Sequence, residues 1–185
     1  MTIKELKENP VKLIADDWAL VSAGTPEDWN TLTVSWGGIG ELWGRDVAFI
    51  FIRPQRYTKK FIDEQDYFTI SFFDPEYKDM LRLCGRISGR DCDKIKEAGL
   101  TLATDGAAVY PAEARLIIKC KKIAVQPLDN SGFLDKTIEK NYASGDYHYM
   151  YVGEIEKVIE KSKKFKKMLD KLTFTVYNKQ VVWEQ

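Results

Sequence analysis

The sequence contains a single histidine, three widely spaced cysteines and no excess of charge of either sign. One histidine and scattered cysteines offer no ligand cluster of zinc spacing, so no metal site is expected. The odd number of cysteines, Cys84, Cys92 and Cys120, argues against a disulfide framework and predicts free thiols. Lysine plus arginine and aspartate plus glutamate both count 28, which excludes a broad basic field for nucleic acid or an anionic membrane.

Long apolar runs are absent as well. No stretch approaches the roughly eighteen uninterrupted apolar residues of a membrane span, and the start, MTIKELKENP, lacks the apolar core of a secretory signal. We therefore expect a cytoplasmic protein that binds neither membrane nor nucleic acid. The 185 residues are 44% hydrophobic and 12% aromatic, which suffices for one sizeable core and predicts a single domain over 1–185.

Short runs rich in Val, Ile, Thr, Phe and Trp, separated by turn residues such as AGTPEDWN and GGIGELWGRD, predict strands. Helical spacing predicts a helix over 56–65, and Asp74 with Pro75 predicts the start of another. DCDKIKEAG predicts a helix that ends at Gly99. Strands are expected near 18–24, 31–37, 47–53 and 67–73, and two longer strands, at 114–126 and 147–160, are expected to pair.

The end of the chain differs in character from the rest. EKSKKFKKMLDK, residues 160–171, predicts a lysine-rich solvated stretch, and TFTVYNKQVVW predicts a terminal hairpin with Asn178 and Lys179 in its turn. The total is about seven strands with three or four short helices. Short, hairpin-linked strands favour a mainly β fold with short helices, an antiparallel barrel of Greek-key type, over a doubly wound parallel sheet.

The glycine-rich segment WGGIGELWG tests the parallel alternative. A dinucleotide-binding turn needs the spacing G-x-G-x-x-G. Counting from Gly38 gives Gly40 and then Trp43, with Gly44 one place late. The spacing fails, so a Rossmann domain is not favoured.

The stretch RPQRYTKKFID concentrates cations where a predicted strand gives way to a helix. A phosphate monoester carries about −1.5 to −2 charges, and free backbone N–H groups at a helix start form a site for it. Arg53, Arg56 and Thr58 would complete such a site with guanidinium and hydroxyl donors. Taken alone, the stretch fits better a solvent-facing helix start whose arginines pair with Glu64 or Asp66.

Four motifs occur in order along the chain. They are NTLTVSWGG at 30–38, RPQRYT at 53–58, SGRDCDK at 88–94 and HYMYVGEI at 148–155. Together they resemble the flavin reductase-like family, the FMN-binding split-barrel proteins that include flavoredoxin, over roughly 18–156. The resemblance implies an FMN-binding split barrel and, with five Trp and nine Phe for one small barrel to bury, a homodimer.

The resemblance also implies where the cofactor lies. The strand matching NTLTVSW would follow the isoalloxazine ring and hydrogen-bond its polar edge through main-chain groups, and RPQRYT would receive the ribityl phosphate. A cation near the ring or the phosphate would raise the reduction potential. The implied cofactor-binding residues are Asn30, Thr33, Val34, Ser35, Trp36, Arg53, Arg56, Tyr57, Thr58, Ser88 and Lys94, and His148 is the implied catalytic residue, touching flavin or nicotinamide.

Each of these side chains also has a purely structural explanation. Trp36 and Trp43 suit a core or a dimer interface. Lys94, with Glu97 three residues on, suits a surface ion pair worth well under about 1 kcal/mol. His148, flanked by tyrosines on a predicted strand, suits a hydrogen-bonded, partly buried position.

The resemblance implies an oxidoreductase that passes electrons from NADH or NADPH through FMN to free flavin, a ferric chelate or a partner protein. An alternative is a flavoredoxin-like carrier that a redox partner protein reduces. A third possibility is a binding module that has lost its flavin, because the tail TFTVYNKQVVWEQ lacks the glycines found in many tails that cover the flavin.

Overall fold

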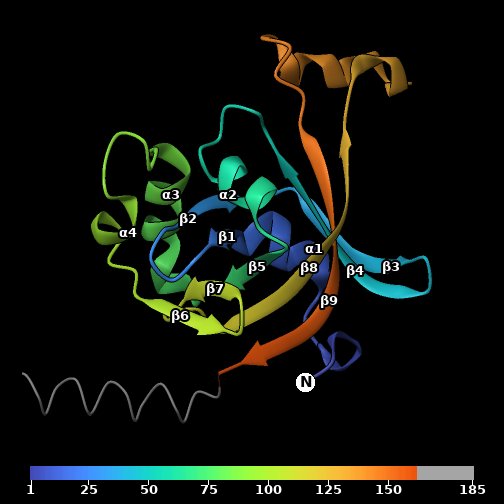
Figure 1. Ribbon diagram of the computed structural model, residues 1–185. Helices are drawn as coiled ribbons and strands as arrows, with labels where there is room; N and C mark the ends of the chain where they lie inside the picture. Colours follow the sequence, from blue (N-terminus) through green and yellow to red (C-terminus); the bar gives the residue numbers. More distant parts are fainter. Residues whose placement is uncertain (162–185) are drawn as a thin grey trace, which may run out of the picture.

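The computed structural model describes residues 1–161 and consists mainly of antiparallel strands with a few short helices (Figure 1). The predicted lysine-rich stretch and terminal hairpin lie almost entirely outside these residues. Seven strands form one sheet in the order β2-β1-β5-β8-β9-β4-β3, and every ladder in it is antiparallel. The strands are β1 (Ala19–Gly24), β2 (Trp29–Val34), β3 (Gly37–Leu42), β4 (Arg45–Ile52), β5 (Tyr67–Phe72), β8 (Leu116–Pro127) and β9 (Tyr149–Glu160).

The sheet curls into a barrel that is split between its two edge strands. β2 and β3 stand at opposite ends of the strand order, yet only Ser35 and Trp36 separate them in the sequence. The chain therefore crosses from one edge of the sheet to the other within two residues, and within residues 1–161 no ladder joins these strands. The outward backbone groups of an edge strand are left available for a ligand.

The core lies inside the curl of the sheet. Every residue of β1 is buried, since β2 and β5 flank it and helices cover its outer face. Apolar side chains from β1, β4, β5 and β8 form the main cluster, and Phe61 and Ile62 of α2 complete it. A second cluster, which includes Phe73, Leu81 and Cys84, holds the helical segment after β5 against the barrel.

The predicted helices are confirmed with shifted bounds. The expected helix over 56–65 is α2 (Thr58–Glu64), and the one after Pro75 is a 3-10 turn continued by α3 (Lys78–Arg86). Asp74 occupies the N-cap position there but makes no capping hydrogen bond. α4 (Lys94–Glu97) begins at the capping side chain of Asp93 and stops before Gly99, which adopts φ +63°.

The glycine-rich segment was wrongly predicted as a turn. It forms β3, which pairs with β4 along its full length, and the expected strand at 31–37 is really β2, which ends at Val34. Trp43 and Gly44, at φ 57° and 71°, make the two-residue turn of this hairpin. The Glu41 carboxylate accepts a hydrogen bond from the Gly44 N–H at 2.6 Å, which stabilises the turn.

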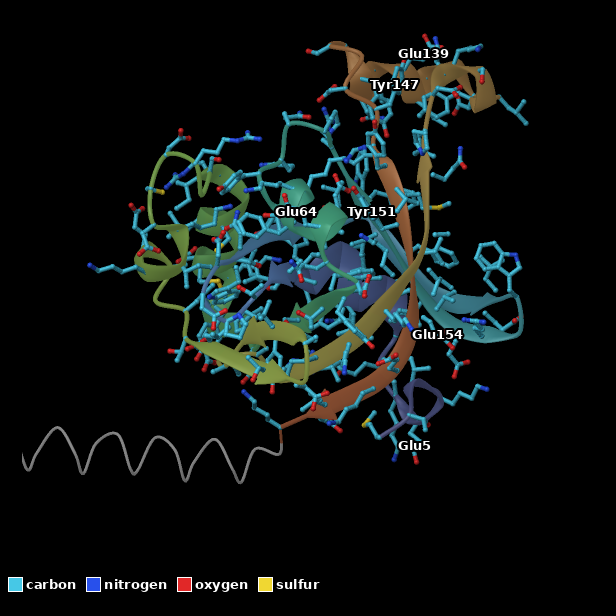
Figure 2. All side chains as sticks on the ribbon, viewed as in Figure 1. Glu5, Glu64, Glu139, Tyr147, Tyr151 and Glu154 are labelled. Carbon is cyan, nitrogen blue, oxygen red and sulfur yellow. The ribbon has the colours of Figure 1, made fainter. Side chains whose placement is uncertain are left out.

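Further segments were not predicted. Pro10–Lys12 (α1) and a π-helical turn at Leu13–Asp17 precede β1. A small second sheet joins β6 (Leu102–Asp105) to β7 (Ala108–Pro111), and an excursion over 128–148, with 3-10 turns, links β8 to β9. In Figure 2 the excursion carries Tyr147 well away from Tyr151 on the barrel.

The long strands β8 and β9 pair as predicted, with register shifts between Lys119 and Cys120 and between Lys122 and Ala124. All three cysteines are free, as predicted. Within residues 1–161, no helix combines the length and apolarity that crossing a membrane requires.

Candidate functional site

A hollow opens where the barrel is split. It spans about 510 Å³, counting the space that is open to solvent. Its walls come from β2, from the link to β3, from β4 and the loop after it, and from the residue that precedes β9. We call it the seam hollow. It is lined by Leu32, Thr33, Val34, Ser35, Trp36, Phe51, Arg53, Arg56 and His148.

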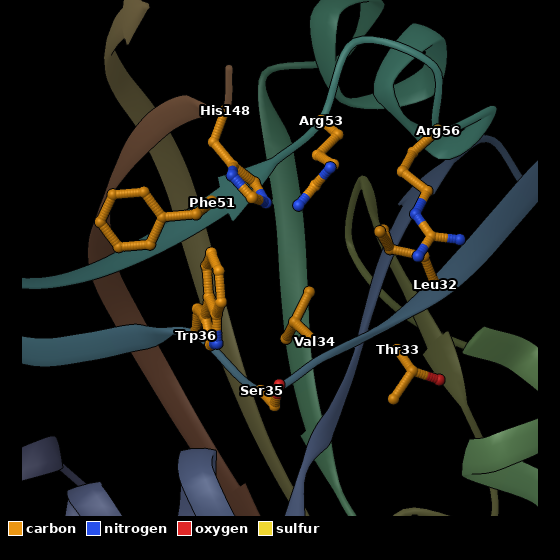
Figure 3. Close-up of a pocket in the computed structure, with 9 residues that line it drawn as sticks. All are labelled: Leu32, Thr33, Val34, Ser35, Trp36, Phe51, Arg53, Arg56 and His148. Atoms are coloured by element: carbon orange, nitrogen blue, oxygen red, sulfur yellow. The ribbon is translucent and has the colours of Figure 1, made fainter. Parts of the chain in front are cut away.

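The seam hollow has an aromatic end and a cationic end (Figure 3). Trp36, Phe51 and His148 gather at one end, and the Trp36 and His148 rings lie 5.1 Å apart. Arg56 stands at the other end, above Leu32. A flat, partly polar molecule that carries a negative group would match this arrangement.

A second hollow, of about 520 Å³, adjoins the first, since Leu32 and Arg56 line both. We call it the helix hollow because the start of α2 forms one wall. Three cations and no carboxylate line it, so its lining carries a strong positive charge. Its lining residues are Leu32, Gln55, Arg56, Tyr57, Thr58, Arg86, Ile87, Ser88 and Lys94.

Lys94 is a buried ammonium, only 4% exposed, rather than the surface ion-pair partner that its sequence context suggested. Its Nζ donates hydrogen bonds to the carbonyl oxygens of Thr31 and Cys84, both at 3.1 Å. Burial lowers the pKa of Lys94, because the charged form loses water. An ammonium carries three N–H donors, so one remains after these two bonds, and no ion pair forms with any carboxylate in residues 1–161.

Arg53 departs from the expected role. Its guanidinium donates to the Asp146 carboxylate at 2.6 Å and to the carbonyl oxygen of Asn141 at 2.8 Å. Gln55 donates to the same Asp146 oxygen at 2.6 Å. The prediction that Arg53 pairs with Glu64 or Asp66 is therefore wrong. Arg53 instead ties the excursion over 128–148 to the end of β4.

The Arg56 guanidinium is not neutralised by a carboxylate among the described residues. Its guanidinium donates to the carbonyl oxygen of Gly85 at 3.0 Å and forms no ion pair with Glu64, Asp66 or any other carboxylate within the described residues. It is exposed and borders both hollows. Arg56 is thus the cation best placed to meet an anion that spans them.

The start of α2 offers fewer free donors than expected. The N–H groups of Lys59 and Lys60 already donate to the carbonyl oxygens of Arg56 and Tyr57, at 3.0 and 3.1 Å. Thr58 is 1% exposed and forms part of the wall of the helix hollow. Side-chain cations, more than backbone groups, therefore supply the positive charge of this hollow.

His148 is buried and uncharged at neutral pH. Desolvation, reinforced by repulsion from Arg53 and Arg56 and opposed by Asp146, lowers its pKa from 6.5 to about 4. Its Nδ1 lies 2.9 Å from the Tyr142 hydroxyl. The ring thus contributes a neutral polar group to the aromatic end of the seam hollow.

The low pKa predicts a pH-dependent stability. Between pH 6.5 and about 4 the unfolded chain binds a proton at His148 that the folded chain does not, so the free energy of unfolding falls as the pH drops through this range. The substitution His148→Gln removes this proton and should flatten the dependence. Thermal unfolding of both proteins between pH 8 and 4 measures the difference, and parallel curves would contradict the assignment.

Asn30 is the one predicted site residue that lines neither hollow. It is 3% exposed, and its Nδ2 has no hydrogen-bond partner within the described residues. A Cβ added to Gly89 would lie 2.9 Å from this nitrogen. Asn30 therefore lies directly beneath the loop that carries Ser88, where only glycine fits without displacement.

The other predicted residues fall into two groups. The seam hollow is lined by Thr33, Val34, Ser35, Trp36, Arg53, Arg56 and His148. The helix hollow is lined by Tyr57, Thr58, Ser88 and Lys94, and also by Arg56. The Thr33 hydroxyl donates to the Leu81 carbonyl oxygen at 2.6 Å, so its one proton is not available to a ligand. The lining residues missed by the prediction are Leu32, Phe51, Gln55, Arg86 and Ile87. The period-two alternation of β4 could have placed Phe51 on the face of Arg53.

Residues 1–161 contain no group of three or more His, Cys, Asp or Glu side chains able to hold a metal ion.

Solved structures resemble this fold over most of the chain. A flavoredoxin from Desulfovibrio vulgaris (Miyazaki F) is 21% identical, with a TM-score of 0.62 over 88% of this chain and 76% of that one. A flavoredoxin from Methanosarcina acetivorans is 18% identical, with a TM-score of 0.62 over 80% and 69%. An FMN-binding protein from Thermus thermophilus with bound p-hydroxybenzaldehyde is 18% identical, with a TM-score of 0.63 over 88% and 83%. These identities show a shared fold.

A family model described as "Flavin reductase like domain" matches residues 12–180. No curated protein sequence matches the chain. Since the family model spans most of the 185 residues, the chain belongs to the flavin reductase-like family.

Proposed function

We propose that this protein binds FMN and transfers electrons from NADH or NADPH through it to an acceptor. The observation that supports this most is that the two hollows are neighbours: the aromatic-ended seam hollow and the cationic helix hollow share Leu32 and Arg56 in their walls. A ring with a hydrogen-bonding edge suits the first and a phosphate suits the second. The buried Lys94 ammonium, with a donor left over and no carboxylate partner, fits an anionic group.

Different residues would bind the ring and the phosphate of FMN. The backbone of Val34 and Ser35 would bond the polar edge of the ring, and Trp36 and Phe51 would exclude water from one end. Arg56 and Lys94 would hold the phosphate and stabilise negative charge near it. Bound FMN supplies the hydride and electron transfer chemistry, which no side chain here provides.

The source of the electrons separates two candidates. A neighbour named as an NADH:FAD oxidoreductase, from Streptomyces globisporus C-1027, is 13% identical with a TM-score of 0.58 over 78% of this chain and 74% of that one, which supports a reductase. The two flavoredoxins support the alternative of a carrier that a redox partner protein reduces. The acceptor would be free flavin, a ferric chelate or a partner protein.

We also propose a homodimer. Trp36 and Trp43 are 46% and 65% exposed and stand at the two ends of β3, before its first residue and in the β3–β4 turn, where a second copy lying along β3 would remove them from water. Sedimentation at several protein concentrations tests this, and a monomer throughout would overturn it.

The visible absorption spectrum tests the function. The protein is incubated with FMN, freed of excess ligand and then mixed anaerobically with NADH or NADPH. Retained flavin bands that bleach support the reductase and identify the donor, whereas retained bands that bleach only with a reduced partner protein support the carrier. Absence of retained flavin and of tryptophan quenching during titration would overturn both.

Arg56→Ala is expected to weaken FMN binding by about 1.5–2 kcal/mol, the lower part of the range for a charge-assisted bond, because the guanidinium is exposed to water. The matched control is Arg82→Ala, which removes an exposed arginine of α3 that pairs with Asp79. Fluorescence titration with FMN compares the variants. Equal affinities would remove Arg56 from the site.

A further inference from the structure

Tyr142 does not line the seam hollow itself, but it contacts two residues that do, His148 and Arg53. Its hydroxyl lies 2.9 Å from His148 Nδ1, and both residues are 7% exposed. Other groups hold the tyrosine ring in place: Phe133 stacks on it at 5.8 Å, Tyr147 packs at 4.8 Å and the Arg53 guanidinium lies 5.4 Å from its centre. A ring confined in this way presents its hydroxyl in one direction.

The excursion that carries Tyr142 is fastened at both ends. Arg53 and Gln55 bind Asp146, and Arg53 also binds the Asn141 carbonyl oxygen. At the base of the excursion the Leu128 N–H donates to the His148 carbonyl oxygen at 2.9 Å. These contacts anchor the segments on either side of Tyr142 and His148 to the barrel.

Hydrogen-bond accounting decides the direction of the Tyr142–His148 bond. Burial raises the pKa of Tyr142, so its hydroxyl keeps its proton at neutral pH. Within residues 1–161 that hydroxyl has no other hydrogen-bond partner than Nδ1. If Nδ1–H donated instead, the buried O–H would have no acceptor among these residues, which is unfavourable. The hydroxyl is therefore the donor, and the single proton of the neutral imidazole lies on Nε2.

We propose that Tyr142 is a positioning residue that holds His148 as the Nε2–H tautomer, so that the seam hollow presents a neutral hydrogen-bond donor suited to a carbonyl oxygen of its ligand. Trp36, whose ring lies 5.1 Å from the imidazole, lines the same end of the hollow. A charged imidazole would attract anions, whereas this neutral one favours an uncharged acceptor. That the acceptor is a ring carbonyl of FMN rests on the proposed function.

Nitrogen NMR of histidine-labelled protein tests the tautomer directly, and His148 is the only histidine in the chain. Long-range proton–nitrogen spectra of the ligand-free protein at pH 7 should show Nε2 protonated and Nδ1 unprotonated. In Tyr142→Phe, which keeps the ring, the ratio of Nε2–H to Nδ1–H should fall about fivefold. A wild-type spectrum with the proton on Nδ1, or an unchanged ratio in the variant, would overturn the proposal.

Tyr147→Phe is the matched control. Tyr147 packs in the same aromatic cluster, and no hydrogen bond joins its hydroxyl to residues 1–161, so its removal should leave the ratio unchanged. An equal shift in both variants would mean that the cluster, and not the hydroxyl, sets the tautomer. Circular dichroism shows whether each variant folds, and the wild-type spectrum decides the tautomer even if one does not.

A second measurement tests the ligand. FMN affinity should fall about fivefold in Tyr142→Phe relative to Tyr147→Phe, because the donor is no longer held. Equal affinities with a shifted tautomer would show that FMN does not use this donor. If the wild type retains no FMN, the proposed function fails, while the ligand-free spectrum still decides the role of Tyr142.

Discussion

Replacing Lys94 with methionine is expected to weaken FMN binding by about 2–3 kcal/mol, a loss of roughly 30- to 150-fold. The ammonium is 4% exposed, so its attraction for an anion in the helix hollow is poorly screened by water. Methionine has similar length and no charge, which limits the change in packing. Fluorescence titration with FMN at neutral pH measures the loss.

The control is Lys96→Met, which removes an exposed lysine two residues along the same helix. It should bind FMN nearly as the wild type does. The pH dependence adds a second readout: because the pKa of Lys94 lies below its usual value, wild-type affinity should decline at alkaline pH before ordinary lysines lose their protons. Identical binding by the Lys94 and Lys96 variants would place Lys94 outside the site.

The sequence predicts the barrel because its strands are short and alternate in the expected way, and most bounds hold to within a few residues. β3 was missed because glycines weaken strand propensity, while its pairing with β4 comes from tertiary context. The β6–β7 hairpin carried a readable signal, Asp105-Gly106 between alternating residues, and Gly106 does take φ +62°. The π-helical turn before β1 has no comparable signal.

The candidate site shows where local patterns stop being informative. RPQRYT looks like one cationic group, yet Arg53 binds Asp146, 93 residues away, whereas Arg56 remains open to the hollows. Lys94 looks like part of a surface ion pair, yet the fold buries it beneath β2. Such long-range partners depend on the packing of the whole chain, which spacing along a sequence does not encode.

The role of Asp146 follows from the same contacts. Its carboxylate receives both Arg53 and Gln55, and these bonds lower its pKa. The ion pair ties the excursion over 128–148 to the end of β4 next to Tyr142, whose hydroxyl contacts His148. Arg53, which the resemblance assigned to the FMN phosphate, therefore helps to position the residues at the aromatic end of the seam hollow.

Gly153→Ala is expected to destabilise the fold by about 1–3 kcal/mol, through overpacking of the core. A Cβ at this position of β9 would lie 2.5 Å from Phe68 Cζ and 2.6 Å from Cys120 Cβ, and Phe68 and Cys120 are buried in the main cluster. Two fully packed neighbours have no free space to move into, so the backbone of β9 must shift. The glycine of the YVGEI motif therefore serves the packing of the barrel.

Thermal unfolding followed by circular dichroism measures this loss, with a shift of about 2–4 °C for each kcal/mol in a chain of this size. Gly132→Ala is the matched control, because no heavy atom lies within 4 Å of an added Cβ there and its φ is not positive. It should unfold at the temperature of the wild type or slightly above it, since alanine restricts the unfolded chain. Equal unfolding temperatures for both variants would mean that β9 moves aside without cost, and that close packing at Gly153 does not constrain the barrel.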